Sequence, residues 1–121
     1  MKSSLILTGL IVAAFSLRIK ADDTSRGQDV FERRCAGCHS LDRDKEGPRL
    51  RGVFGRSAGG SPSFIYSDGL KKSRISWDDA SLDRWLTDPE KLVPETDMAF
   101  RLSSADERKQ VIAFLKRSSQ P

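Results

Sequence analysis

The sequence predicts a small all-α domain in which short helices alternate with long loops. Several stretches have apolar residues at helical spacing and begin next to residues that commonly cap helices. No stretch shows the alternation of apolar and polar residues that is typical of a strand. A chain of 121 residues is expected to form one domain with a thin core, and such domains depend on disulfides, a metal or a cofactor. The only two cysteines lie three residues apart, which excludes a disulfide framework.

Two helices are predicted at the two ends of the mature chain. Asp23 can cap a helix that runs to about Arg34. Ser104 and Glu107 form a capping-box pattern that opens the last helix. The apolar stripe of this last helix contains Val111, Phe114 and Leu115.

Two shorter helices are predicted between them. One fits residues 68–72. The next begins at Asp78 or Asp79 and ends before Pro89, because a residue that precedes proline is disfavoured in a helix. Its apolar residues at helical spacing are Leu82, Trp85 and Leu86.

The segment from Cys38 to about Ser67 is predicted to be a long loop. It is interrupted by glycines and prolines at Gly47, Pro48, Gly52, Gly55, Gly59, Gly60 and Pro62. A loop of nearly 30 residues without regular structure is unusual in a small domain. It is explained if the loop wraps a group that is not protein.

The first 21 residues are predicted to be a signal peptide. Lys2 supplies a positive start, and residues 5–17 form a largely apolar stretch that suits a signal-peptide core and is short for a membrane span. Cleavage after Ala21 fits the abrupt change of composition at Asp22, although Ile19 is large for its place before the cleavage site; an uncleaved N-terminal anchor is the alternative. The mature domain is therefore predicted to span residues 22–121 and to be exported, to the periplasm or the outer face of the inner membrane.

The charge of the chain gives no support to nucleic-acid binding. The formal net charge is +4, but Lys2, Arg18 and Lys20 belong to the leader, which holds no acidic residue. Without them, 18 basic residues face 17 acidic ones, a net charge of +1. Charges of both signs are mixed along the mature chain, as in an ordinary globular protein.

The motif Cys35-Ala36-Gly37-Cys38-His39 points to a covalently attached haem c. Two thiols at this spacing can form thioethers to the two vinyl groups of one haem, and the adjacent histidine can reach the iron. Three other interpretations of this motif have less support. A structural zinc site needs four ligands, and the chain has two cysteines and one histidine; a thioredoxin-like pair needs a βαβ setting; a simple disulfide leaves the histidine unexplained.

The second axial ligand is expected to be Met98. His39 is the only histidine, and Met1 is lost with the leader. Elimination therefore points to Met98, which directly follows the proline-containing segment 93–97. An isolated methionine is usually core filler, but a haem protein without another candidate reverses that expectation. A thioether ligand raises the reduction potential, and a second protein ligand closes the iron to small molecules. The protein is therefore predicted to be a one-electron carrier and not an oxygen-activating enzyme.

From about residue 23 to 117 the chain resembles the class I cytochrome c family, in the branch of mitochondrial cytochrome c and bacterial cytochrome c2. The resemblance is carried in order by Gly27 with Phe31, the 35–39 motif, 47–50, 52–56, 64–67, 75–77, 86–89, Val93-Pro94 with Thr96, Met98 and Phe100, and 111–115. It implies the small cytochrome c fold, in which long loops wrap the haem and the first and last helices cross where Gly27 and Phe31 pack on Phe114.

The resemblance also implies roles around the haem. The Pro48 carbonyl accepts a hydrogen bond from the histidine nitrogen that is not bound to iron, which fixes the ring. The haem propionates or their surroundings are hydrogen-bonded by Arg56, Tyr66, Ser67, Trp77 and Thr96. The implied partners are membrane or periplasmic redox proteins of respiration or photosynthesis, with a bc1-type donor and an oxidase- or reaction-centre-type acceptor. A monomer without nucleic acid is expected.

Four positions depart from the mitochondrial pattern. Trp85 stands where a tyrosine is common near the methionine sulfur, and Leu70 stands where an asparagine joins a buried water network. Glu90 and Asp97 stand where the mitochondrial branch has lysines near the exposed haem edge. The competing class, a haem peroxidase or gas sensor, needs an open iron and distal acid–base groups, and the chain has no second histidine to supply them.

Overall fold

A computed structural model describes residues 24–121 of the chain, so the predicted signal peptide (1–21) and the predicted cap Asp23 lie outside the described residues. Residues 24–30 are α-helical and continue into a π-helical turn, η1 (Phe31–Cys35). The later helices are α2 (Asp68–Lys72), α3 (Asp79–Thr87), α4 (Pro89–Leu92) and α5 (Ala105–Ser118). The only β interaction among the described residues is an isolated bridge between Ser57 and Ser76. The predicted all-α class is confirmed.

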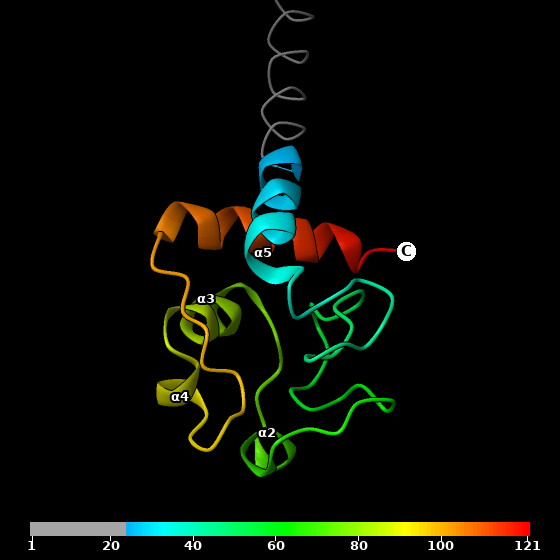
Figure 1. The fold of residues 1–121 in the computed structure, drawn as a ribbon, viewed down its shortest axis with the longest axis vertical. Coiled ribbons are helices and arrows are strands. Elements are labelled where there is room, and N and C mark those ends of the chain that lie inside the picture. The colour runs from blue at the N-terminus through cyan, green and yellow to red at the C-terminus, as the bar shows by residue number, and fades with distance from the viewer. Residues whose placement is uncertain (1–23) are drawn as a thin grey trace, which may run out of the picture.

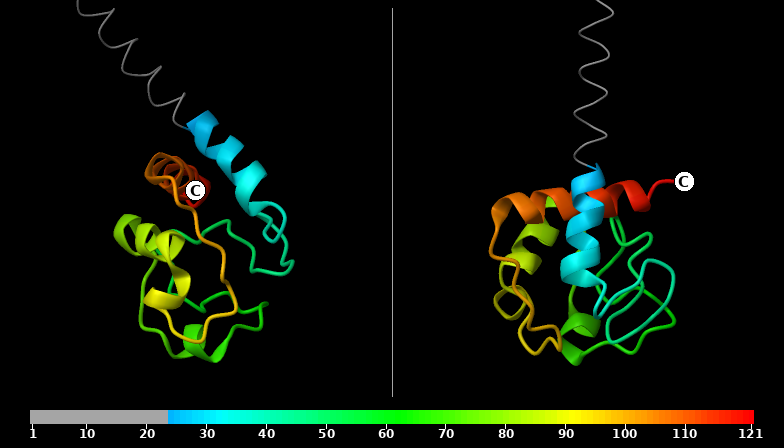
Figure 2. Two further views of the ribbon diagram at one scale, coloured as in Figure 1. Left: turned by 60° about the vertical axis from the view of Figure 1, so that its left-hand side comes forward. Right: turned by 45° about the horizontal axis from the view of Figure 1, so that its top comes forward.

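The first helix crosses α5, as Figures 1 and 2 show from three directions. At the crossing, a Cβ on Gly27 would overlap the carbonyl oxygen of Gln110 and lie 2.7 Å from Phe114 Cβ, so glycine is what allows the backbones to approach. The rings of Phe31 and Phe114 pack with their centroids 5.4 Å apart. The crossed helices that the resemblance implied are therefore present.

The core lies under this crossing, between the first helix, α3 and α5. Val111 is completely buried, and the predicted stripe of α5 faces inward as a whole. Arg108 of α5 donates to Asp83 of α3 at 2.8 Å and to the carbonyl oxygens of Leu102 and Ser103. These bonds hold the chain segment that enters α5 against α3.

The helix boundaries follow local capping, with one element that the sequence analysis missed. Asp78 and Ser81 form a reciprocal capping box that opens α3, which ends before Pro89 as predicted. Pro89 does not end helical structure altogether, because it is the first residue of α4. The side chain of Asp88 caps this helix by accepting a hydrogen bond from the backbone N–H of Lys91. Proline is well suited to this position because its missing N–H would have no partner there.

Of two other boundaries, α5 begins directly after its cap Ser104, as predicted, and the first helix ends close to the predicted Arg34. The first helix runs one residue beyond Arg34, to Cys35, and its last turn is wider than an α-helix, with the Ala36 N–H bonded to the Phe31 carbonyl. At the start of α5, Ser104 accepts a hydrogen bond from the N–H of Glu107. The Glu107 carboxylate pairs with Arg34 at 3.3 Å, so it ties the two crossing helices together.

The segment 38–67 has no helix or strand, as predicted, and yet it is held by many backbone hydrogen bonds. The N–H of Leu50 bonds to Ser40, the N–H of Gly55 to Trp77, and the N–H of Ala58 to Ile75. Gly59 takes a left-handed φ of 72°, and a Cβ there would lie 2.9 Å from the Leu70 carbonyl oxygen. The loop therefore forms a fixed wall. Within residues 24–121 no helix is long and apolar enough to cross a membrane.

Candidate functional site

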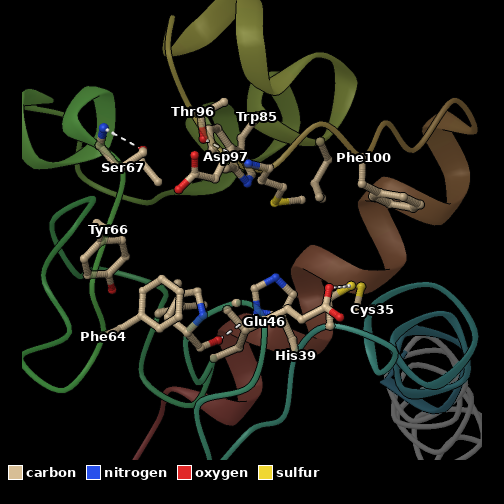
Figure 3. Close-up of a pocket in the computed structure, with 18 of the residues that line it drawn as sticks. Cys35, His39, Glu46, Phe64, Tyr66, Ser67, Trp85, Thr96, Asp97 and Phe100 are labelled. Atoms are coloured by element: carbon tan, nitrogen blue, oxygen red, sulfur yellow. Dashed lines mark hydrogen bonds between the residues drawn. The ribbon is translucent and has the colours of Figure 1, made fainter.

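The loops and helices enclose a cavity of about 410 Å³, a size typical of cofactor sites. Its apolar walls come from the loop, α2, α3 and the segment between these two helices, with Leu50, Val53, Leu70, Trp77, Leu82, Trp85 and Leu86. Figure 3 shows the cavity with His39 and Cys35 on one side and Thr96, Asp97 and Phe100 on the other. Every residue that the sequence analysis assigned to the haem or its surroundings lines this cavity.

Cys35 is the last residue of the π-helical turn, and Cys38 lies in the turn that follows; both line the cavity. Both are free thiols in the structure; Cys35 is half-buried and Cys38 is exposed. Burial raises the pKa of the Cys35 thiol to about 11, and the neighbouring Cys38 adds to the shift. A hydrogen bond to the Glu46 carboxylate raises the pKa of Cys38. Neither thiol is therefore an activated thiolate of the catalytic kind.

His39 is held by the segment that follows it. Its Nδ1 lies 2.8 Å from the carbonyl oxygen of Pro48. Because a carbonyl only accepts, Nδ1 must carry the proton, which leaves Nε2 with a free lone pair. Burial lowers the pKa of His39, as does the charge of Lys45, while the bond to Pro48 opposes both. A neutral imidazole with a fixed tautomer is what a metal needs as a ligand.

Gly47 lies against the same imidazole. A Cβ at Gly47 would overlap His39 Cε1 and lie 2.7 Å from both ring nitrogens. Only glycine allows the backbone to pass so close to the ring. Gly47 and Pro48 therefore set the position and the orientation of His39 between them.

Met98 comes from the segment between α4 and α5. It is half-buried and packs against the hydrophobic core, and its N–H is 3.4 Å from Thr96 Oγ1. Glu95 takes a left-handed φ of 65°, which turns the chain before Thr96. The rings of Trp85 and Trp77 pack with their centroids 5.3 Å apart, and both residues are buried and line the same cavity.

One part of the cavity is polar, and its hydroxyl and guanidinium groups can donate hydrogen bonds into the cavity. Tyr66 OH accepts from the N–H of Ser61 at 3.0 Å, and Ser67 Oγ accepts from the N–H of Leu70 at 3.3 Å. Each hydroxyl is thus oriented by a backbone donor and keeps its own proton for another partner, as does Thr96. Arg56 donates to the Arg49 carbonyl, but its Nε is buried without a partner. Donors of this kind suit an anionic group.

Two acidic residues in the loop escaped the sequence analysis. Glu46 lines the cavity and accepts from Cys38 Sγ at 3.4 Å. Asp44 accepts from the N–H of Arg49 at 2.9 Å and from the hydroxyl of Ser63 at 2.7 Å, so it links two parts of the loop. Glu46 could have been suspected from its place directly before Gly47, whereas nothing in the sequence pattern pairs Asp44 with Ser63.

Three comparisons with known proteins give the same family for this chain. The sequence profile of the cytochrome c family matches residues 24–119. The chain belongs to the cytochrome c family. Cytochrome c of Gibberella zeae is 39% identical over 102 residues, covering 81% of this chain and 96% of the relative, and cytochrome c of Euglena viridis is 40% identical over 97 residues, covering 78% and 95%.

A solved structure gives the same answer for the fold. Cytochrome cH from Methylobacterium extorquens is similar with a TM-score of 0.73 and 41% sequence identity, covering 78% of this chain and 97% of the other. The chain is thus an electron-transfer protein and not an enzyme, and its family carries covalent haem c.

The residues of this cavity fit a haem. Apolar walls suit the faces of a porphyrin, two cysteines and a neutral histidine line one side, and the buried Arg56 Nε, which has no partner, is a donor that suits an anionic group. Among residues 24–121 no cluster of three or more His, Cys, Asp or Glu is arranged to hold a metal ion directly.

Proposed function

We propose that the chain carries single electrons on one covalent haem c, attached through Cys35 and Cys38 and ligated at iron by His39 and Met98. The observation that supports this most strongly is that all four residues line one cavity. Met98 follows Asp97, which lies across the cavity from His39 (Figure 3). The haem supplies reversible one-electron chemistry at its iron.

The chain contributes orientation, exclusion of water and charge compensation. Pro48 and Gly47 hold the imidazole so that Nε2 is available to the iron, and the Met98 sulfur would be the second protein ligand. The buried Trp77 and Trp85 line the same cavity as Met98, and their large apolar rings exclude water from part of it. Arg56, Tyr66, Ser67, Trp77 and Thr96 are proposed to bind the propionates or their surroundings, which offsets the cost of burying carboxylates.

Export and partners are part of the proposal. A signal peptide at 1–21 and an exported domain at 22–121, in the periplasm or on the outer face of the inner membrane, are proposed from the apolar stretch 5–17 and the change of composition at Asp22. The partners are redox proteins, a bc1-type donor and an oxidase- or reaction-centre-type acceptor, which a monomer meets in turn. Such encounters are weak and fast, so they depend on the charges near the cavity opening.

Absorption spectroscopy of the purified holoprotein tests the ligation. A weak ferric band at the red end of the spectrum reports sulfur from methionine, and a ferrous iron with two protein ligands does not bind carbon monoxide. Acid–acetone extraction tests the attachment, because thioether-bound haem stays with the polypeptide. Haem in the organic phase would refute the thioethers, and rapid binding of carbon monoxide would refute the closed iron.

A further inference from the structure

The opening of the cavity is bordered by six exposed lining residues, which we call the rim. They are Arg34, Cys38, Glu46, Asp97, Ala99 and Phe100. Phe100 is 40% exposed, an unusual state for a large aromatic side chain, so the rim has an apolar part. Figure 3 shows Glu46 on the side of His39 and Asp97 on the opposite side, so the two carboxylates flank the opening.

The charges of the rim are not balanced. Its one cation, Arg34, is paired with Glu107 at 3.3 Å, whereas among the described residues neither Glu46 nor Asp97 forms an ion pair. Glu46 accepts a hydrogen bond from the Cys38 thiol, but a thioether sulfur has no proton to donate, so this carboxylate loses that partner in the holoprotein. Two exposed carboxylates are thus available to a partner.

Three of the cations next to the rim in the chain have partners within the protein, whereas Lys91 is exposed and forms no ion pair among the described residues. Arg33 pairs with Asp29 at 3.0 Å, and Arg101 pairs with Asp88 at 3.2 Å. The ammonium group of Lys45 donates to the Ala36 carbonyl at 2.7 Å, at the end of η1, where a helix end attracts a cation. The segment 88–101 on the methionine side carries four carboxylates and only two cations.

We propose that this rim binds redox partners whose own docking face carries lysine or arginine side chains around an apolar centre. Glu46 and Asp97 would face those cations, and Phe100 and Ala99 would meet the apolar centre. The inference rests on the proposed electron-transfer function and specifies its partner. It differs from what net charge alone implies, because the mature chain is predicted to be slightly positive.

The test is stopped-flow oxidation of the reduced holoprotein by two small reagents over a series of ionic strengths. Tris(phenanthroline)cobalt(III) is a trication and ferricyanide is a trianion. If the rim is locally negative, the rate with the cobalt complex falls as salt rises, and the rate with ferricyanide rises. Comparing salt slopes avoids the different driving forces of the two reagents.

Single-charge variants locate the effect. E46Q and D97N are each expected to slow the cobalt reaction about threefold at low salt. The control D68N changes the net charge equally at an exposed position that does not line the cavity, and it should change the rate clearly less. The double variant E46K/D97K should reverse both salt slopes. Unchanged haem spectra in every variant show that the site is intact.

Two results would overturn the inference while leaving the carrier function in place. One is a ferricyanide rate that falls with rising salt in the unaltered protein. The other is a D68N effect as large as those of E46Q and D97N, which would show that only the net charge matters. Failure of both reagents to oxidise the haem would instead contradict the electron-carrier function itself.

Discussion

His39 Nδ1 lies 2.8 Å from the Pro48 carbonyl oxygen, while the backbone of Gly47 passes against the face of the same imidazole. The two neighbours thus act differently on one ring: Pro48 fixes its tautomer and rotation, and Gly47 fixes how far it can move. Replacing Pro48 would keep the carbonyl, so the informative change is at Gly47.

Gly47→Ala is expected to displace the imidazole, because the added Cβ would overlap His39 Cε1. The strain should lower the free energy of unfolding of the holoprotein by about 1–3 kcal/mol. It should also shift the reduction potential and weaken the red ferric band, since the displaced imidazole would be a poorer ligand for the iron. Denaturant titration and redox titration measure these effects.

Gly37→Ala is the matched control for this change. Gly37 lies in the same attachment region, but a Cβ there would meet no atom within 4 Å, and its φ is not in the left-handed region. This variant should keep the stability and the potential of the parent protein. Equal effects at Gly37 and Gly47 would show that close contact with the imidazole is not the cause.

The crossing of the first helix and α5 gives a second prediction. Gly27→Ala should destabilise the protein by at least as much as Gly47→Ala, about 1–3 kcal/mol, because a Cβ would overlap the backbone of α5 and separate Phe31 from Phe114. The potential should change little, since Gly27 does not line the cavity. Denaturant titration beside redox titration separates the two effects, and a large change of potential would contradict this division.

The helices were predictable because each has a local cause. The short α2 was predicted with its observed bounds, and α3 and α5 begin at side-chain caps visible in the sequence. The helix α4 was missed because Pro89 was considered only as the end of a helix, although Asp88 before it can cap a new one. A proline that begins a helix and a proline that follows the end of one have the same sequence signature, and only the neighbouring residues distinguish them.

The site was predictable in part. The cysteine–histidine motif and the elimination that leads to Met98 depend only on residue counts and spacing, and these residues do meet at one cavity. The contacts of Asp44 with Ser63 and of Glu46 with Cys38 depend on the path of a loop without period. The pairing of Arg34 with Glu107, which removes a cation from the rim, joins residues 73 apart and has no local signature.

Asp44 gives a prediction about pH. The hydrogen bond from the Ser63 hydroxyl lowers the pKa of Asp44 most, followed by the bond from the Arg49 N–H. Because the folded pKa lies below the unfolded one, the contribution of Asp44 to stability is present above the unfolded value of about 4 and is lost as the pH falls through the folded value.

Asp44→Asn should therefore lower the Tm of the holoprotein at pH 7, and the gap to the parent protein should close as the pH falls below about 4. Thermal unfolding followed by circular dichroism over a pH series measures this gap. Ser63→Ala removes only the stronger of the two bonds, so it should produce a smaller gap that closes over a similar range. A gap that stays constant down to pH 2 would mean that the ionised carboxylate is not the cause.

Met98→Ala tests the proposed iron ligand directly. Loss of the sulfur should abolish the weak red ferric band, lower the reduction potential, and allow carbon monoxide to bind the ferrous protein, because a thioether stabilises ferrous iron and closes the coordination site. Leu70→Ala is the control, since Leu70 also lines the cavity and its truncation removes apolar volume without removing a ligand. It should keep the red band and exclude carbon monoxide. If Met98→Ala keeps the red band and its iron stays closed, Met98 is not the ligand; a closed iron with a changed spectrum would point to another side chain, with Lys91 the first to examine because it is an exposed amine close to Met98 in the chain.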